Sequence, residues 1–215
     1  MKKGISLLSL LLLLIVTTQT FAQVKFGVKA GLNLSNMTQK DDTHTYSNNY
    51  KMKTGFHFGV TAEFPISESF SFEPGMLYSS KGYTEKETDY KVTAGVNYLE
   101  IPMNAIYKIN LGGTMMLISA GPYLGFALSG KYKGTERGHD FDESINIGNN
   151  EDTDDIKALD YGLNIGVGAE IKQITIGLQY GLGLANISSY TGEGSRASNK
   201  VIGISVGYKF GKNLK

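Results

Sequence analysis

A strict period of two runs through eight segments of this chain. In the clearest, residues 161–171, every odd position is apolar and every even position is Gly, Asn or Glu. Successive side chains of a β-strand point to opposite faces, so each segment gives a sheet one apolar face and one polar, glycine-lined face. A fully apolar sheet face needs an apolar solvent. A closed barrel in a lipid bilayer supplies that solvent and leaves no strand edge unpaired.

The spacing of these segments predicts their topology. We expect strands near residues 25–34, 54–64, 70–81, 97–108, 115–129, 160–171, 174–185 and 200–210. The connections alternate in length: 65–69, 109–114 and 172–173 are short, whereas 35–53, 82–96, 130–159 and 186–199 are long and polar. Short periplasmic turns, long outer loops and an even strand number are typical of outer-membrane proteins. The prediction is an all-β, eight-stranded antiparallel up-and-down transmembrane β-barrel.

Residues 1–22 have the pattern of a cleaved signal peptide. Two lysines precede an apolar run over residues 5–16, and small residues at the end of the segment supply a cleavage site after Ala22. We expect the barrel domain to occupy residues 23–215. The alternative is a retained anchor, but about a dozen apolar residues fall short of the roughly 20 that span a bilayer. The absence of cysteine excludes a lipoprotein anchor and disulfides.

The overall charge gives no sign of a nucleic-acid partner. Twenty-one Lys and Arg residues against twenty Asp and Glu residues leave a net charge of +1. Nucleic-acid binding depends on a surplus of basic side chains, which is missing here.

Four short motifs resemble those of a known family. They are KFGVKAGLNLS at 25–35, YLEIP at 98–102, GPYLG at 121–125 and DYG at 160–162. In this order they resemble the strand motifs of small PorT-like outer-membrane β-barrel proteins, the porin family, over essentially the whole mature chain. The resemblance implies a barrel fold and a location in the outer membrane of a Gram-negative bacterium. It implies no assigned activity, and the word porin is no sign of a pore.

Charged side chains collect on the polar face near the short turns. Strand parity turns seven of them inward: Lys25, Lys29, Glu63, Glu73, Lys108, Glu170 and Lys209. The interior of an eight-stranded barrel is just wide enough for side chains to fill. We therefore expect a structural charge network that plugs the lumen, formed by Lys29, Glu63, Glu73, Lys108, Glu170 and Lys209. A gate or a proton path through the same residues is the functional alternative.

A second inward set lies nearer the long loops: His57, Lys81, Glu100 and Asp160. Histidine with a carboxylate raises the question of a hydrolase, but no nucleophile context surrounds the nearby serines. We interpret His57 as a hydrogen-bonded lumen residue and predict no catalytic residue. With three histidines and no ligand-spaced pair, we also predict no metal and no cofactor.

The longest predicted loop, 130–159, is acidic. Asn150, Asp152 and Asp154 have the alternate spacing of the first calcium ligands in an EF-hand, but Asp155 stands where the turn glycine belongs. We expect a solvated loop. Loose binding of divalent cations beside lipopolysaccharide phosphates is the alternative.

Three prolines fall inside consecutive predicted strands. Pro74, Pro102 and Pro122 cannot donate to a β-ladder, and a closed barrel has no edge to hold them. We expect bulges at these positions, which either shape the wall or form a deformable seam for a partner.

Three functions fit these observations. We favour a non-enzymatic outer-membrane barrel with long extracellular loops, a plugged lumen and a structural or interaction role in the envelope. A small-solute channel is the first alternative, and a soluble periplasmic barrel that binds an apolar ligand is the second. The expected partners are outer-membrane lipid, lipopolysaccharide, the barrel-assembly machinery, which the alternation at 206–210 suits, and an envelope protein. We expect a monomer.

Overall fold

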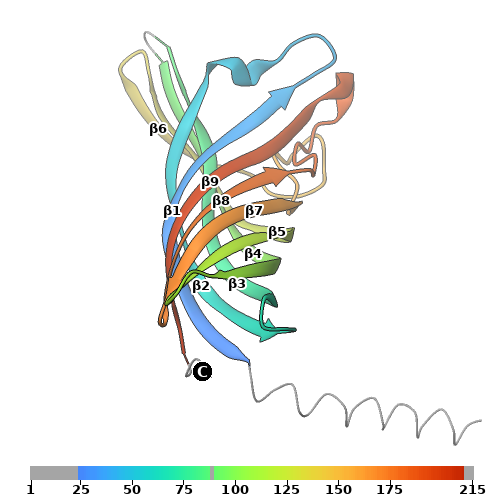
Figure 1. The fold of residues 1–215 in the computed structure, drawn as a ribbon. Coiled ribbons are helices and arrows are strands. Elements are labelled where there is room, and N and C mark those ends of the chain that lie inside the picture. Colours follow the sequence, from blue (N-terminus) through green and yellow to red (C-terminus); the bar gives the residue numbers. More distant parts are fainter. Residues whose placement is uncertain (1–23, 88–89, 211–215) are drawn as a thin grey trace, which may run out of the picture.

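The computed structural model describes residues 24–87 and 90–210. Eight antiparallel strands close into a ring in the order β1, β2, β3, β4, β5, β7, β8 and β9, which returns to β1 (Figure 1). The predicted eight-stranded up-and-down barrel is confirmed. The strands are β1 (Lys25–Lys40), β2 (Tyr50–Pro65), β3 (Phe70–Lys86), β4 (Tyr90–Asn110), β5 (Thr114–Glu136), β6 (His139–Ser144), β7 (Leu159–Ile171), β8 (Ile174–Gly183) and β9 (Arg196–Lys209).

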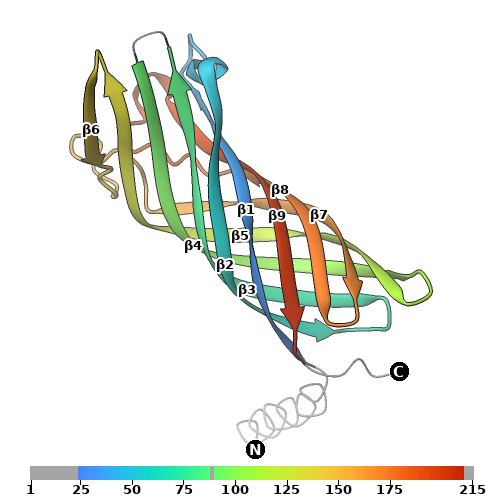
Figure 2. The same ribbon diagram turned by 90° about the vertical axis from the view of Figure 1, so that its left-hand side faces the viewer.

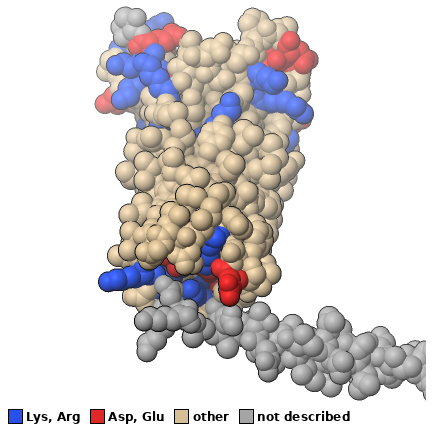
Figure 3. Space-filling model, in the orientation of Figure 1, with Lys and Arg blue, Asp and Glu red and all other residues tan. Residues whose placement is uncertain are grey.

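The apolar face of every barrel strand points outward. On β1, Phe26 and Leu32 are 64% and 59% exposed, whereas Asn33 between the outward positions is buried. Figure 3 shows the result as a broad belt without charged side chains between two charged ends. A soluble barrel that binds an apolar ligand requires the opposite facing, so this structure contradicts that alternative.

The short connections gather at one end of the barrel, as predicted. β2 and β3 are joined by residues 66–69, β4 and β5 by 111–113, and β7 and β8 by 172–173. Gly112, Gly113 and Lys172 adopt positive φ angles in these turns. Tight turns of this kind let neighbouring antiparallel strands pair up to their last residues.

The predicted long loops are partly wrong, because much of their length is strand. β1 continues to Lys40, β3 continues to Lys86 and β5 continues to Glu136. Residues 82–96 and 130–159 therefore contain paired hairpins, whereas in 35–53 the extended parts of β1 and β2 pair with β9 and β3. β6 adds a further strand that, within the described residues, pairs only with β5. Figure 2 shows these extensions rising beyond the barrel on one side. The outward face of such an extension lies beyond the lipid, so its outward positions hold Lys and Thr side chains and not a run of apolar residues.

The predicted bulges at the prolines are also wrong. Pro74, Pro102 and Pro122 keep their places in the ladders, with the same register before and after each. A proline removes one N–H donor, which costs one ladder bond and requires no inserted residue. The register shifts lie elsewhere, between Met52 and His57 on β2 and between Asn97 and Tyr98 on β4.

No helix in the described residues is long and apolar enough to cross a membrane. The predicted signal peptide, 1–22, lies outside the described residues.

Candidate functional site in the barrel lumen

An ion-paired layer crosses the lumen near the short turns. At its centre the fully buried carboxylate of Glu63 on β2 accepts hydrogen bonds from Lys108 on β4 and Lys209 on β9. The hydroxyl of Ser71 donates to the same carboxylate at 2.9 Å. Because hydrogen bonds satisfy both oxygens, this carboxylate can remain charged inside the wall.

Lys209 joins Glu63 to two further carboxylates. Its Nζ lies 2.9 Å from Oε2 of Glu170 on β7 and 3.5 Å from Oε2 of Glu73 on β3. We call these five residues, Glu63, Glu73, Lys108, Glu170 and Lys209, the inner cluster. They come from five different strands, and their side chains cross the interior. The predicted charge network is therefore present in five of its six members.

Lys29 is the sixth predicted member, and the structure places it outside the inner cluster. Its side chain points inward from β1, and within the described residues it forms no salt bridge. It lines a cavity of about 60 Å³ between the inner cluster and the long-loop end. Strand parity correctly predicted that Lys29 points into the lumen. It could not predict the position of Lys29 along the barrel axis, because that position depends on strand tilt.

A second ion-paired layer lies nearer the long loops. Nζ of Lys81 on β3 lies 2.7 Å from Oε2 of Glu100 on β4 and 3.3 Å from Oδ2 of Asp160 on β7. The same ammonium group lies 4.3 Å from the ring centroid of Tyr123 and 5.1 Å from that of Tyr98. Aromatic faces and carboxylates together satisfy a cation that has been removed from water.

Asp160 links this layer to β5 and β9. Its Oδ2 accepts hydrogen bonds from Nδ2 of Asn199 at 3.0 Å and from the Tyr123 hydroxyl at 3.2 Å. Asn199 also donates to the Tyr98 hydroxyl at 3.3 Å. We call Lys81, Tyr98, Glu100, Tyr123, Asp160 and Asn199 the outer cluster. The sequence pattern predicted its three charges but not the two tyrosines or Asn199, although strand parity turns all three of these residues inward.

His57 does not join the outer cluster. Its Nδ1 lies 2.8 Å from Oδ1 of Asn33, and Nδ2 of Asn33 donates to Oγ of Ser79 at 3.1 Å. The imidazole is thus bonded to an amide and not to a serine hydroxyl, an arrangement that activates no nucleophile. Within the described residues, no three His, Cys, Asp or Glu side chains are placed to hold a metal ion.

Apolar side chains close the mouth above the outer cluster. Ile145 and Ile156, from the segment between β6 and β7, are buried against Val96 and Tyr98 on β4. A second buried group, Met37, Ala185, Ile187 and Ala197, packs beside Tyr50 and Tyr83. Buried apolar side chains exclude water from the entrance.

The acidic segment between β6 and β7, predicted as part of a solvated loop, is held by hydrogen bonds of its own carboxylates and backbone. Oδ2 of Asp154 accepts a hydrogen bond from the backbone N–H of Asn150, and Oδ2 of Asp155 accepts one from that of Asn146, both at 2.8 Å. The backbone N–H of Lys157 donates to the carbonyl of Ile187 at 2.8 Å, which ties this segment to the connection between β8 and β9. The carboxylates hold the turn that places Ile145 and Ile156 over the mouth.

The chain matches one family model and is similar to several solved structures. The model of the family described as outer membrane protein beta-barrel domain matches residues 19–189. Among solved structures, the chain is similar to Ail, the attachment invasion locus protein of Yersinia pestis, at 14% identity and TM-score 0.41, with 86% of this chain and 98% of that chain covered.

Two further structures are similar to the chain. Neisserial surface protein A has 14% identity and TM-score 0.44, with 86% of this chain and 97% of that chain covered. The N-terminal β-barrel domain of Pseudomonas aeruginosa OprF has 12% identity and TM-score 0.34, with 87% and 100% covered. No curated protein matches the chain. The family model spans β1 to β8, and it includes both ion-paired layers apart from the residues that β9 contributes. Because the model matches most of its length, the chain belongs to the outer membrane protein beta-barrel domain family.

Proposed function

We propose that this chain is a non-enzymatic integral protein of the outer membrane of a Gram-negative bacterium, of the small PorT-like kind, with a closed lumen. In this proposal the barrel anchors the outer hairpins and loops at the cell surface, where they take a structural or interaction role in the envelope. Cleavage after Ala22 would release the mature barrel into the periplasm for assembly as a monomer.

The proposal rests on three layers of side chains that fill the lumen one after another along the barrel axis. The inner and outer clusters, each built from side chains of several strands, are followed by the apolar mouth, where the segment between β6 and β7 packs on β4. Two cavities along the lumen have volumes of about 60 and 30 Å³, enough for a few water molecules. A barrel filled in this way holds its shape and conducts no steady current.

The small-solute channel is the second candidate, and the cavity beside Lys29 is the observation that favours it. Lys29 forms no salt bridge with any residue in 24–87 or 90–210, and a lysine of this kind next to water-sized space resembles the lining of a hydrated path. Opening such a path requires both clusters to separate their ion pairs.

Conductance of the purified protein in planar lipid bilayers decides between the two candidates. We expect no stable current from the wild type or from the control variant Glu68→Gln, whose side chain is exposed in the turn before β3. Reproducible single-channel steps in the wild type, with an ion selectivity that changes in Glu63→Gln, would replace the closed barrel by the channel.

Lipopolysaccharide is the proposed neighbour of the outer hairpins. Lys86, Lys91, Lys131 and Lys133 occupy outward positions on β3, β4 and β5 beyond the apolar belt. Lysines at this height can pair with phosphate groups. Surface tags test the orientation: tags at Asn48, Glu87 and Asn149 should be labelled on intact cells, and a tag at Gly112 should not. Labelling at Gly112 alone would invert the barrel in the membrane.

A further inference from the structure

The sheet that rises beyond the barrel has two chemically different faces. Its outward face carries the four lysines at positions 86, 91, 131 and 133. Its inner face, which continues the lumen wall, carries aromatic rings and carboxylates in register across four strands. On that face Tyr83 pairs with Ala94, Ala94 with Tyr132, and Tyr132 with Glu143. The next rows place Val92 beside Gly134 and Phe141, and Tyr90 beside Glu136.

A bulge makes this arrangement possible. Asn97 pairs with Ser129 but Tyr98 pairs with Ala127, so one extra residue of β5 is accommodated at this point. The extra residue reverses the parity of β5 beyond it and turns Tyr132 to the inner face. Gly134 on the same strand leaves room for the ring of Phe141, because a Cβ at Gly134 would come 2.9 Å from Cζ of Phe141.

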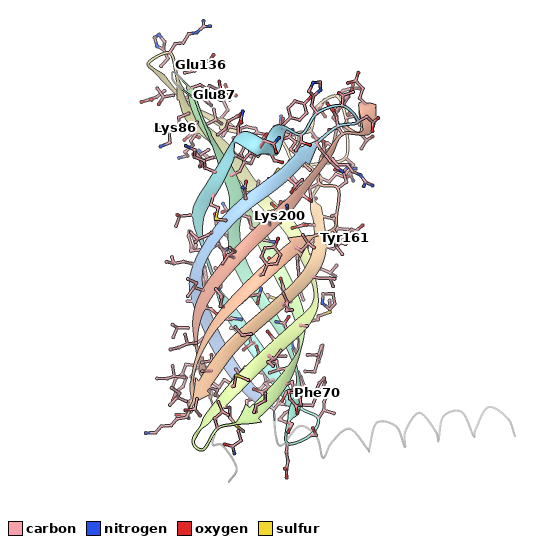
Figure 4. The ribbon with its side chains drawn as sticks, turned by 45° about the horizontal axis from the view of Figure 1, so that its top comes forward. Phe70, Lys86, Glu87, Glu136, Tyr161 and Lys200 are labelled. Atoms are coloured by element: carbon pink, nitrogen blue, oxygen red, sulfur yellow. The ribbon has the colours of Figure 1, made fainter. Side chains whose placement is uncertain are left out.

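These side chains surround an open concavity of about 620 Å³. We call it the aromatic–acidic concavity and define it by Tyr83, Tyr90, Tyr132, Glu136, Phe141 and Glu143. Its volume is in the range of small-molecule sites. Figure 4 shows Glu136 and Glu87 at the tip of the sheet.

The charge around the concavity is negative. Arg137, in the turn between β5 and β6, also lines it, but within the described residues this guanidinium forms no salt bridge with the carboxylates. Burial raises the pKa of Tyr90 above its usual value, and the nearby carboxylates of Glu85, Glu136 and Glu87 raise it further. A cation brought to this place would be attracted by the carboxylates and by the ring faces.

The same chain shows how this chemistry holds an ammonium group. In the outer cluster, two tyrosine rings and two carboxylates surround Nζ of Lys81. The concavity repeats the combination of tyrosine rings and carboxylates higher along the same wall, with no lysine of the chain among its lining residues.

We propose that the aromatic–acidic concavity binds a small organic cation through its ammonium group. The rings of Tyr90, Tyr132 and Phe141 supply cation–π contacts, and Glu136 and Glu143 supply the counter-charge. This site lies outside the lumen, so it goes beyond the closed barrel proposed above and stands independently of any conductance.

Titration of the purified protein in detergent micelles tests the proposal. The probes are choline, spermidine and 3,3-dimethylbutanol, the last being a neutral molecule with the shape of choline. Chemical shifts of the backbone amides of β4, β5 and β6 report binding. We expect saturable shifts with choline and spermidine at millimolar concentration, and none with 3,3-dimethylbutanol.

Two neighbouring residues of β6 give a matched pair of variants. Glu143 faces the concavity, whereas Asp142 faces outward and lies 3.0 Å from Nζ of Lys131. We expect Glu143→Gln and Tyr132→Leu to weaken choline binding about fivefold each, and Asp142→Asn to leave it unchanged. Resistance of the folded barrel to unheated SDS, measured for each variant, separates lost binding from lost folding.

Several outcomes would overturn the proposal. They are equal binding of the neutral probe, equal loss in the Asp142→Asn variant, or no saturable shift in the folded wild type. Binding of spermidine without choline would restrict the ligand to primary ammonium compounds and support the site in that narrower form.

Discussion

The Nζ atom of Lys209 on the last strand lies 2.9 Å from the Oε2 atom of Glu170 on β7. Glu170 is one of three carboxylates that share this ammonium group, and Glu63 is the one that both lysines of the inner cluster contact. The cluster therefore has a centre and a periphery, and its members should differ in what they contribute to stability.

Loss of the central carboxylate should cost more than loss of a peripheral one. Glu63→Ala leaves Lys108 without its carboxylate, and we expect a loss of about 3–5 kcal/mol in the free energy of unfolding. Glu170→Ala leaves Lys209 with Glu63 and Glu73, so about 1.5–3 kcal/mol is expected. Because the chain has no tryptophan, urea unfolding should be followed by far-UV circular dichroism. Equal losses would show that the cluster has no centre.

The two faces of β8 should respond differently to arginine. Leu178 is 48% exposed on the apolar belt, and arginine there should cost about 2–4 kcal/mol. Gln179 lines the cavity beside Lys29, where water can solvate a new cation, so Gln179→Arg should cost less. The measurement is the unfolding free energy in lipid vesicles. A larger loss at Gln179 would mean that the lumen is too tightly filled to admit the side chain.

Two inward glycines should differ sharply in their tolerance of alanine. At Gly31 a Cβ would come 2.1 Å from the carbonyl oxygen of Ile204 and 2.7 Å from the His57 ring, so β1 and β9 would have to separate. At Gly177 the nearest atom would be 3.5 Å away. We expect Gly31→Ala to lower the yield of folded barrel and Gly177→Ala to leave it unchanged, as judged by electrophoresis of unheated samples. Normal folding of Gly31→Ala would show that the two strands do not approach so closely.

The carboxyl of Asp41, in the connection between β1 and β2, should titrate at unusually low pH. The Tyr46 hydroxyl donates to it at 2.6 Å, and the backbone N–H groups of His44 and Thr43 donate at 2.6 and 2.7 Å. These bonds hold the pKa of Asp41 well below its usual range. A lowered pKa means that the carboxylate stabilises this connection above its ordinary pKa and loses that effect as the pH falls through the lowered value.

Removing the Tyr46 hydroxyl, which lowers the pKa of Asp41 more than any other group, should raise that pKa. In Tyr46→Phe we expect the pKa of Asp41 to rise toward its ordinary value, measured from the pH dependence of the carboxyl carbon shift. Tyr161→Phe on the apolar belt is the matched control and should leave it unchanged. An unmoved pKa in Tyr46→Phe would assign the effect to the backbone donors.

The fold inside the apolar belt could be predicted from the sequence because lipid requires every strand to turn its apolar face outward. Leu163 and Ile165 must face outward, which turns Asn164 inward, and the same parity placed Glu63, Glu170 and Lys209 in the lumen. Parity says nothing about height, so it could not separate Lys29 from the inner cluster or His57 from the outer one. Heights follow from strand tilt and register, which are properties of the closed ring.

Beyond the belt the same reasoning fails for a physical reason. The outward face of the outer hairpins meets water and not lipid, so no run of apolar residues marks it, and the facing of Tyr132 and Lys133 does not follow from the pattern of the belt. The bulge between Ala127 and Ser129 then decides the facing of Tyr132, and no residue type in that stretch marks it.

The inner cluster has a consequence for the way the barrel is completed. Lys209 comes from the last strand, 146 residues after Glu63, and until β9 docks between β1 and β8 the carboxylates of Glu63, Glu73 and Glu170 lack this shared counter-ion. A half-assembled sheet that entered the membrane would carry excess negative charge on the surface that is to become its interior. Insertion and closure are thereby coupled: the intermediate with an open seam is the species that lipid disfavours, and the final strand both seals the wall and neutralises what the wall encloses.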